Sequence, residues 1–368
     1  MTLLSIIIAN SSWKVAYDNV FYKFKLIENF NLHMIINDFL MAIFFLYVTL
    51  EIKKEIKYGM LSSFKKASFP VVASLGGVIV PAIIYTLFNL KSGYLQGLGA
   101  VISTDIAFAV GIFMIFKSRL NTSLKIFLLS LAVVDDLISI LVILLLYSSK
   151  LNYTALLVSI LLVGLLMALS KVFKVKNVSV YLMIGLVLWY FVHLSGIHAT
   201  ISGVFLAITI PADRIEGKDS ISEKLEHKLM PLCNIFILPL FAFANTSIAL
   251  NINGAVPHAT SLVMGVICGL VIGKPLGVVL FSYIATKLHI AEKPEDASWR
   301  AILEVAMLTG IGFTMAIFTS ELAFSYSKDV INLTKISILV GAVLSVIITN
   351  VLLSTKSIRF RIRGFVKH

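Results

Sequence analysis

Long apolar runs separated by short polar connections dominate this chain. The runs that we interpret as membrane-spanning helices are 35–52, 67–88, 94–116, 124–147, 153–170, 179–194, 197–210, 229–250, 259–284, 300–324 and 333–353. A bilayer core requires ~20 consecutive apolar residues in a helix. Residues 1–10 are apolar but too short to span, so we expect a shortened first helix, with an upstream start as the alternative. The pattern predicts an all-α polytopic membrane protein of about 12 transmembrane helices, the first one truncated.

The composition agrees with this pattern. The chain has 368 residues, of which 59% are hydrophobic and 14% are charged, whereas soluble domains carry about 25% charged residues. No stretch is polar enough to form a soluble domain or a nucleic-acid-binding module, so we expect one membrane-transport domain over 1–368. Its parts are the truncated first helix and periplasmic segment (1–34), the transmembrane helices (35–353) and a basic tail (354–368).

Lysine and arginine fall mainly in alternate connections. The connections that are rich in Lys and Arg hold 23 of these residues. They are 53–66, 117–125, 171–177, 212–228, 285–300 and the tail. The other connections together with segment 11–34 hold six. Because Lys and Arg concentrate in cytoplasmic loops, this asymmetry predicts a cytoplasmic C-terminus. The basic residues of the tail are Lys356, Arg359, Arg361, Arg363 and Lys367.

Two adjacent acids lie at the centre of one apolar run. Asp135 and Asp136 are near the middle of 124–147. A carboxylate at mid-bilayer costs ~2.5–3.5 kcal/mol on insertion scales. Solubility, capping and turn formation do not explain two of them there. We therefore expect both to face a protein-lined or water-filled interior and to act on a species that crosses the membrane.

Two other runs contain sequences that interrupt helices. Ser103-Thr104-Asp105 lies in mid-segment, and all three side chains compete for backbone hydrogen bonds. A second weak point spans Thr309 to Thr314 and contains Gly310 and Gly312. Two interrupted segments in corresponding places of two halves indicate a transporter site. Lys274 lies deep in 259–284 and needs an anionic partner. The candidates are Asp105, Asp135 and Asp136, along with the exposed carbonyls of an interrupted helix.

Other acids and motifs are less informative. Glu304 and Glu321 lie toward the two ends of 300–324, so helix-end placement explains both. No His, Cys and Asp cluster has the spacing of a tight metal site, no nucleotide motif appears, and no cofactor is expected. An intramembrane aspartyl protease, a passive cation channel and a sodium symporter are the alternatives, but an adjacent Asp pair with a buried Lys favours coupled exchange.

Several strings resemble the NhaA-type sodium/proton antiporters of bacterial inner membranes. They are Ser-Thr-Asp-Ile-Ala-Phe-Ala (103–109), Leu-Lys-Ile-Phe-Leu (124–128), Val-Asp-Asp-Leu (134–137), Ser-Gly-Ile-His-Ala-Thr (195–200), Leu-Pro-Leu-Phe-Ala-Phe-Ala-Asn (238–245), Gly-Lys-Pro-Leu-Gly (273–277) and Gly-Ile-Gly-Phe-Thr-Met (310–315). The resemblance implies a multi-pass inner-membrane protein with inverted repeats and two interrupted helices that cross at mid-membrane.

The same resemblance assigns roles. Asp135 and Asp136 become the pair that binds the transported ion and protons, Asp136 directly. Thr104, Asp105 and Lys274 support the site, and Gly310 and Gly312 supply interrupted-helix backbone. The implied function is a secondary transporter, not an enzyme, that extrudes Na⁺ or Li⁺ in exchange for H⁺ under the proton gradient. Protons and cation would compete for the same carboxylate oxygens.

The resemblance also bears on regulation by pH and on assembly into a dimer. The pH-sensing region of the family corresponds to Glu51, Lys54, Glu55, Lys224, Glu226 and His227. Met230 stands where the family has a second histidine, so we expect a flatter or displaced pH dependence, because His titrates near neutral pH. The family dimerises through a β-hairpin; residues 20–32 alternate as a strand would, with Glu28-Asn29 as the candidate turn, which suggests a homodimer in membrane lipid.

Overall fold

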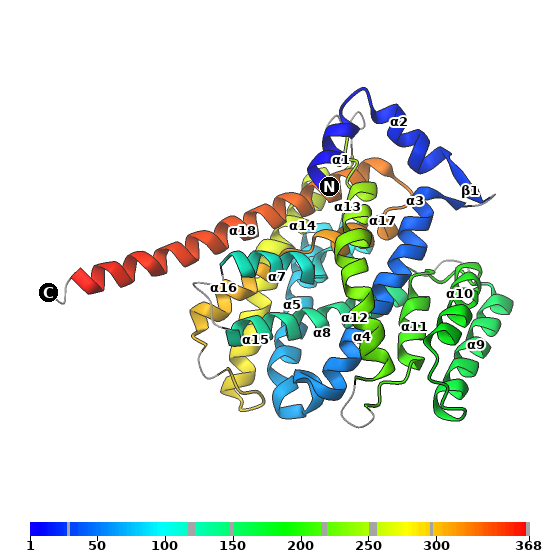
Figure 1. Cartoon of the computed structure of the whole chain (residues 1–368). Coiled ribbons are helices and arrows are strands. Elements are labelled where there is room, and N and C mark those ends of the chain that lie inside the picture. Colours follow the sequence, from blue (N-terminus) through cyan, green and yellow to red (C-terminus); the bar gives the residue numbers. More distant parts are fainter. Residues whose placement is uncertain are drawn as a thin grey trace. The chain divides into compact units, whose positions relative to one another are not determined.

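Helices form most of the computed structural model (Figure 1). The structure describes residues 1–27, 30–116, 122–147, 151–214, 219–249, 256–294 and 297–365, the last eleven of these by their backbone alone. The predicted turn Glu28-Asn29 and the tail residue Lys367 lie outside the described residues. The remaining basic residues of the tail belong to the part described by backbone alone.

The predicted helical membrane fold is confirmed. Within the described ranges, eight helices are long and apolar enough to cross a bilayer: Leu32–Tyr58, Ala67–Asn89, Leu95–Ile115, Ser123–Leu146, Tyr153–Lys171, Ile221–Asn245, Ala259–Lys287 and Lys328–Ser354. A ninth arises if α16 (Trp299–Thr309) and α17 (Phe313–Ala323), bent by 46°, count as one span. The predicted run 197–210 forms only the nine-residue α11 (Ile201–Thr209). The total of twelve stays a prediction.

Polar residues at the helix starts explain several boundaries. Asn152 caps α9 (Tyr153–Lys171), accepting hydrogen bonds from the first amides of the helix, and Asn177 does the same for α10 (Val178–Leu194). Ser220 and Glu223 form a reciprocal capping box at α12 (Ile221–Leu232). These side chains satisfy amides that have no partner within the helix, so each fixes where an apolar run begins.

The chain divides into two compact units, each built from two segments, and α8 (Thr122–Leu146) contributes to both. The first unit comprises 1–62 and 140–252. Its elements before α9 are α1 (Thr2–Ala9), α2 (Lys14–Asp18), η1 (Asn19–Lys23), β1 (Lys25–Ile27), β2 (Phe30–Asn31), α3 (Leu32–Met34), η2 (Ile35–Leu40), α4 (Met41–Tyr58) and η3 (Met60–Ser62). After α12 follow η5 (Cys233–Ile237) and α13 (Leu238–Asn245).

The first unit contains a β-hairpin, a close contact between two helices and an apolar core. The short strands β1 and β2 pair antiparallel, so the predicted alternation in 20–32 does form a hairpin. Helix α4 packs on α11, where Gly203 lies so close that an added Cβ would overlap the carbonyl oxygen of Ala42. Buried Leu50, Tyr181 and Leu188 belong to the apolar core of the unit.

The second unit comprises 63–139 and 253–368. It contains α5 (Phe64–Asn89), η4 (Leu95–Leu98), α6 (Gly99–Ile102), α7 (Ile106–Ile115), the first part of α8, α14 (Ala259–Cys268), the π-helical turn η6 (Gly269–Gly273), α15 (Lys274–Lys287), α16, α17 and α18 (Lys328–Phe365). Helices α5 and α15 touch at the backbone, because a Cβ on Gly76 or Gly277 would overlap the carbonyl oxygen of the other. Helix α18 continues past the predicted end of its span at residue 353.

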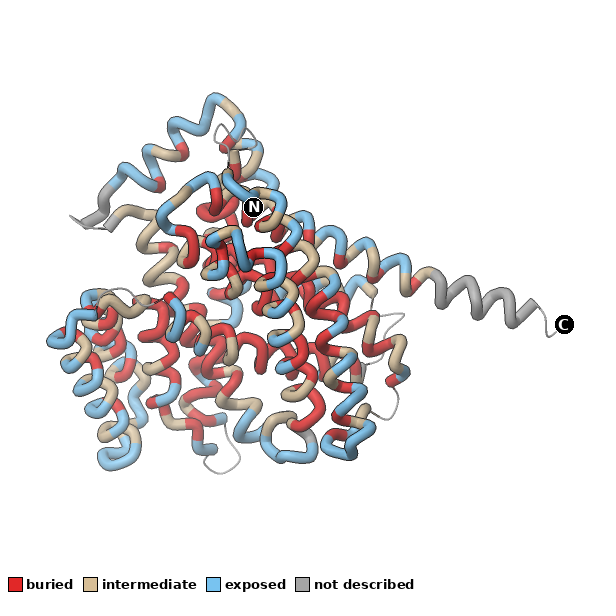
Figure 2. The backbone as a smooth tube through the Cα atoms, turned by 180° about the vertical axis from the view of Figure 1, so that it is seen from behind, coloured by how far each residue is buried: buried red, intermediate tan, exposed pale blue. Residues whose placement is uncertain are grey.

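Burial differs sharply between helices (Figure 2). Every residue from 304 to 320, along most of α16 and α17, is buried. Helix α9 instead exposes Leu157, Ile160, Leu161 and Leu165. A large apolar surface of this kind is favourable against lipid and unfavourable against water. The second unit therefore encloses the stretch 304–320, and the polar groups of this stretch need partners inside the protein.

Candidate functional site

Two helices of the second unit are interrupted where polar residues or glycines replace the apolar pattern. Ser103, Thr104 and Asp105 separate α6 from α7, and Asp105 has extended backbone. Residues 310–312 separate α16 from α17. The amide of Asp105 donates a hydrogen bond to the carbonyl of Ile311 at 2.8 Å, so the two interruptions meet. An added Cβ on Gly312 would lie 2.9 Å from the carbonyl oxygen of Ser103, which explains why glycine suits this meeting point.

Asp105 lies at the start of two half-helices at once. Its carboxylate accepts hydrogen bonds from the amide of Phe108 at 3.1 Å, in the first turn of α7, and from the amide of Thr314 at 3.0 Å, in the first turn of α17. The hydroxyl of Thr314 also donates to it. Helix N-termini carry partial positive charge and unsatisfied amides. Asp105, only 2% exposed, therefore supplies carboxyl oxygens to both ends.

Asp135 is surrounded by donors. Lys274 Nζ lies 3.0 Å from its Oδ2, and the Thr104 hydroxyl lies 2.7 Å from the same oxygen. The hydroxyl of Ser74 on α5 donates to Oδ1. Asp135, Lys274, Thr104 and Ser74 are all 0% exposed. Of the three acids considered as partners for Lys274, Asp135 is the one that forms the ion pair.

Thr104 connects this cluster to the end of α16. It accepts a hydrogen bond from Lys274, and its hydroxyl lies within donating distance of both Asp135 Oδ2 and the carbonyl oxygen of Thr309, at 3.1 Å. A hydroxyl has one hydrogen to donate. Thr104 therefore donates fully to only one of these two oxygens at a time.

Asp136 follows Asp135 on α8 and is 2% exposed. Consecutive helical residues point ~100° apart, so Asp136 presents its carboxylate on an adjacent face of α8. The cluster thus holds two neighbouring carboxylates, one of them fixed by Lys274 and two hydroxyls. Carboxylate and hydroxyl oxygens are the groups that hard cations prefer. Among the described residues no three His, Cys, Asp or Glu side chains group as a metal cluster would.

The sequence did not identify three members of this arrangement. Ser74 is one of two serines in the apolar helix α5, where serine is common, and only the packing of α5 shows that it contacts Asp135. Thr309 and Thr314 flank the predicted interruption, but their separate contacts with Thr104 and Asp105 depend on how the two breaks cross. The pair of threonines around Gly310 and Gly312 is the signal that could have identified Thr309 and Thr314, whereas Ser74 gave no signal.

The residues predicted to sense pH all lie in the first unit. Lys54 on α4 forms an ion pair with Glu226 on α12 at 3.0 Å, and Glu226 is 4% exposed. Glu55 accepts a hydrogen bond from the amide of Met60, while Glu51 is partly buried on α4. Lys224 and His227 are exposed on α12. The structure therefore joins Lys54 to Glu226, and Glu51 lies close enough to interact electrostatically with Glu226, Lys54 and Glu55.

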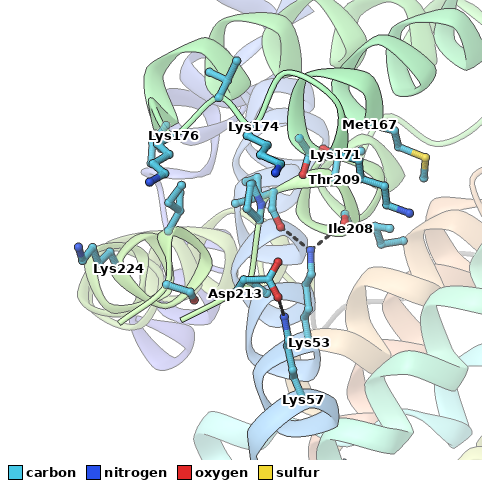
Figure 3. Close-up of a pocket in the computed structure, with 18 of the residues that line it drawn as sticks. Lys53, Lys57, Met167, Lys171, Lys174, Lys176, Ile208, Thr209, Asp213 and Lys224 are labelled. Atoms are coloured by element: carbon cyan, nitrogen blue, oxygen red, sulfur yellow. Dashed lines mark hydrogen bonds and ion pairs between the residues drawn. The ribbon is translucent and has the colours of Figure 1, made fainter. Parts of the chain in front are cut away.

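A lysine-rich cavity of about 940 Å³ lies in the same unit (Figure 3). Its basic lining residues are Lys53, Lys57, Lys171, Lys174, Lys176 and Lys224. Lys53 donates to the carbonyls of Ala207 and Ile208 near the end of α11. Lys57 pairs with Asp213 and lowers the pKa of that carboxyl below its usual range. Two of the six lysines are thus engaged in holding the connection after α11.

Comparisons with known proteins identify the family of this chain. A family model described as Na⁺/H⁺ antiporter 1 matches residues 1–353. The chain is 42% identical to a Na⁺/H⁺ antiporter NhaA 2 of Aliarcobacter butzleri, over 97% of this chain and 93% of that protein. It is 41% identical to a Na⁺/H⁺ antiporter NhaA of Helicobacter pylori (strain P12), over 94% and 89%. For NhaA of Pelagibacter ubique the identity is 42%, over 94% and 90%.

A solved structure shows the same fold at low identity. The sodium proton antiporter MjNhaP1 of Methanocaldococcus jannaschii superposes with a TM-score of 0.54 at 14% identity, covering 97% of this chain and 89% of that one. At this identity the match bears on the fold alone. The whole-length family match and the curated relatives bear on membership: this chain is a multi-pass membrane protein of the Na⁺/H⁺ antiporter 1 family.

Proposed function

We propose that this protein is a secondary transporter that exchanges Na⁺ or Li⁺ for H⁺ across a bacterial inner membrane. The proton gradient drives extrusion of the metal cation, and the C-terminus faces the cytoplasm. Family membership and the names of the relatives support the exchange of Na⁺ for H⁺. The distribution of Lys and Arg between alternate connections supports the orientation.

The observation that carries the proposal is the enclosed cluster of Asp135, Asp136 and Lys274 beside two interrupted helices. A buried carboxylate requires a positive partner, which is a metal cation, a proton or an ammonium group. Asp135 has Lys274 as that partner. A cation that enters beside Asp136 competes with protons for the same oxygens. One site that accepts either species, but not both, couples their two fluxes.

Lys274 gives this competition a physical basis. A metal ion that approaches Asp135 brings a second positive charge next to the ammonium group. Like charges at such distances repel strongly in a medium of low dielectric constant. Lys274 then has to move from Asp135 or release its proton. Asp136, on the adjacent face of α8, is the group that ligates the ion directly, and Asp135 with Lys274 sets the charge beside it.

The crossing of the interrupted helices supplies the surroundings of the site. Asp105 balances the positive ends of α7 and α17, and Thr104 supplies a hydroxyl between Asp135 and the end of α16. Backbone that leaves the helix at residues 310–312 offers carbonyl oxygens to a cation. Gly310 and Gly312 therefore contribute to the site through their main-chain atoms. Neither has a side chain that would push the two interrupted segments apart where they cross.

The remaining assignments concern regulation and assembly. We assign pH sensing to Glu51, Lys54, Glu55, Lys224, Glu226 and His227, supported by the ion pair between Lys54 and Glu226. The hairpin of β1 and β2 supports a homodimer. Transport then needs no cofactor, since the carboxylates and the lysine carry the charge changes.

The test is exchange by purified protein in liposomes. A Na⁺ or Li⁺ gradient should move protons, measured with an internal pH dye, and K⁺ should have little effect. Asp136→Asn should abolish exchange while the protein remains folded by thermal melting. Asp213→Asn, at an exposed carboxylate of the first unit, is the matched control and should retain exchange. Full activity in the Asp136 variant would remove this carboxylate from the mechanism.

A further inference from the structure

Glu304 is a buried acid outside the cluster described above. The sequence suggests a helix-end role, yet Glu304 lies in the second turn of α16 and is 0% exposed. Arg300 Nε donates to its Oε1 at 3.1 Å. Its Oε2 accepts no hydrogen bond from any residue that the structure describes. Burying a carboxyl oxygen without a hydrogen-bond partner costs free energy.

The acid lies in a polar seam between α16 and α18. Two contacts bound the seam: Arg300 Nη2 donates to the carbonyl of Leu352 at 2.6 Å, and an added Cβ on Gly310 would lie 2.7 Å from Ser345 Oγ. The two helices therefore run antiparallel, with Glu304 between the contacts. Ser345 and Leu352 are seven residues apart, so they share one face of α18.

Further polar atoms line the same seam. Thr349 lies between Ser345 and Leu352 on that face of α18, and its hydroxyl donates to the carbonyl of Ser345. Ser345 Oγ is buried and has no hydrogen-bond partner among the residues that the structure describes. Apolar packing of α16 against α18 would not need an acid and two hydroxyls, all 0% exposed. Their grouping indicates a polar pathway.

The two ends of the seam lead to different places. The side chain of Arg300 is 34% exposed, so this end approaches the surface of the second unit. At the other end, Thr309 precedes Gly310, and its carbonyl oxygen lies 3.1 Å from the hydroxyl of Thr104, which contacts Asp135. Glu304 is five residues before Thr309, or about 7.5 Å along the helix axis.

The other charges near α16 do not compensate Glu304. Helix α7 and residues 341–353 of α18, both packed on α16, contain no ionisable side chain. Helix α15 also packs on α16 and carries Lys274, Tyr283 and Lys287. Lys274 is paired with Asp135, Tyr283 contacts the ring of Trp299, and Lys287 is exposed. Arg300 is thus the charged group that faces Glu304.

We propose that Glu304 is a transit site for the transported proton, between the Asp135 cluster and the face where α16 begins. This inference rests on the proposed antiport. A proton binds Glu304 Oε2, forming an O–H bond, and leaves the same oxygen toward the hydroxyls at Ser345 and Thr104, or returns along the reverse path. Arg300 can donate to Oε1 in both states, because a carboxylate and a neutral carboxyl group each offer an acceptor oxygen.

A purely structural role predicts different behaviour. Arg300 already ties α16 to α18 through Leu352 without help from Glu304, so a structural Glu304 would only hold the guanidinium in place. Glu321 offers a matched comparison, because it forms an ion pair with Lys335 between α17 and α18 at 2.5 Å. Glu321→Gln removes a charge from a helix-joining ion pair that lies outside the proposed pathway.

The first experiment measures exchange in liposomes at saturating Na⁺ over a range of pH. Glu304→Gln should slow exchange about tenfold at alkaline pH, where protons are scarce, which is less than the ~10²–10⁴-fold that a positioned acid or base contributes to a reaction. The KM for Na⁺ should not change, and Glu304→Asp should restore most of the rate. Glu321→Gln should keep the pH profile of the parent. An equal slowing at every pH, with the same slowing in Glu304→Asp, would overturn the transit site.

The second experiment does not depend on transport. Infrared difference spectra of the parent protein, recorded between two pH values, should contain a protonated-carboxyl C=O band that is missing in Glu304→Gln and present in Glu321→Gln. If the band persists in Glu304→Gln, Glu304 does not take up a proton and the inference is wrong. If the parent exchanges no Na⁺ for H⁺ but the band behaves as expected, the antiport proposal fails and the proton site stands.

Discussion

Lys274 Nζ lies 3.0 Å from Asp135 Oδ2 in a place where neither side chain is accessible to solvent. Truncating one partner of such a pair leaves the other as an uncompensated buried charge, which costs ~3–5 kcal/mol. We predict that Lys274→Ala lowers the melting temperature in detergent strongly and abolishes exchange. The exposed Lys91→Ala serves as the control and should change neither.

A double variant separates charge from packing at this pair. Replacing Asp135 by Asn together with Lys274→Ala removes both charges, so part of the lost stability should return, although exchange should not. Coupled neighbours deviate from additivity by about 0.5–3 kcal/mol. Strict additivity of the two single effects on melting would show that the ion pair contributes nothing to stability.

The crossing of the two interruptions has its own test. A Cβ at position 312 would lie 2.9 Å from the carbonyl oxygen of Ser103, and overpacking of this kind costs about 1–3 kcal/mol. Gly312→Ala should therefore destabilise the protein and reduce exchange severely. Gly111→Ala on α7 is the comparison, because an added Cβ there meets nothing within 4 Å. Equal melting temperatures for the two variants would refute a tight crossing.

Thr314 links α17 to Asp105 through both its amide and its hydroxyl. Thr314→Val keeps the shape and the amide but removes the hydroxyl donor. Leaving a buried acceptor short of a donor costs ~1–3 kcal/mol, so we expect lower thermal stability and slower exchange. In Thr319→Val the lost hydroxyl only contacted carbonyls of its own helix, so melting should change less. The opposite order would contradict the role given to Asp105.

Met230 lies one helical turn after His227 on α12 and is 41% exposed. A histidine at this position would titrate near its usual pKa of ~6.5. We predict that Met230→His makes the exchange rate depend more steeply on pH around neutrality, because a second positive charge appears beside Glu226 and Lys54 as pH falls. Met230→Leu should leave the profile as it is. An unchanged profile in the histidine variant would argue against this region as the sensor.

Local sequence was sufficient for features that a helix cannot tolerate. Ser103-Thr104-Asp105 and the glycines at 310 and 312 oppose a continuous helix through their own chemistry, so the breaks could be placed without knowing their neighbours. A lysine in the middle of a membrane span likewise requires an acidic partner, which could be predicted. That this partner is Asp135 and not Asp105 or Asp136 depends on which helices pack against each other. Ser74 gave no such signal, because a serine in an apolar helix costs little.

Glu304 shows a different limit of sequence interpretation. Its position one turn into the apolar run 300–324 predicts helix-end placement. Glu304 is fully buried although Arg300, one turn earlier, is partly exposed, and this burial depends on the packing of α18 and α15. The two breaks could be predicted from composition, but the depth of an acid below the protein surface could not.

The backbone contact between Gly76 and Gly277 limits which parts of the site can move. Ser74 and Lys274 lie two and three residues from these glycines, on helices α5 and α15, which have no side-chain layer between them at that point. Sliding the two helices along each other would require main-chain atoms to pass each other. Ser74 and Lys274, two of the three donors to Asp135, are therefore held at a fixed distance from each other. Any opening of the ion site toward one side of the membrane must then come from α8 or from the unwound stretches, which shift against a stationary pair of donors.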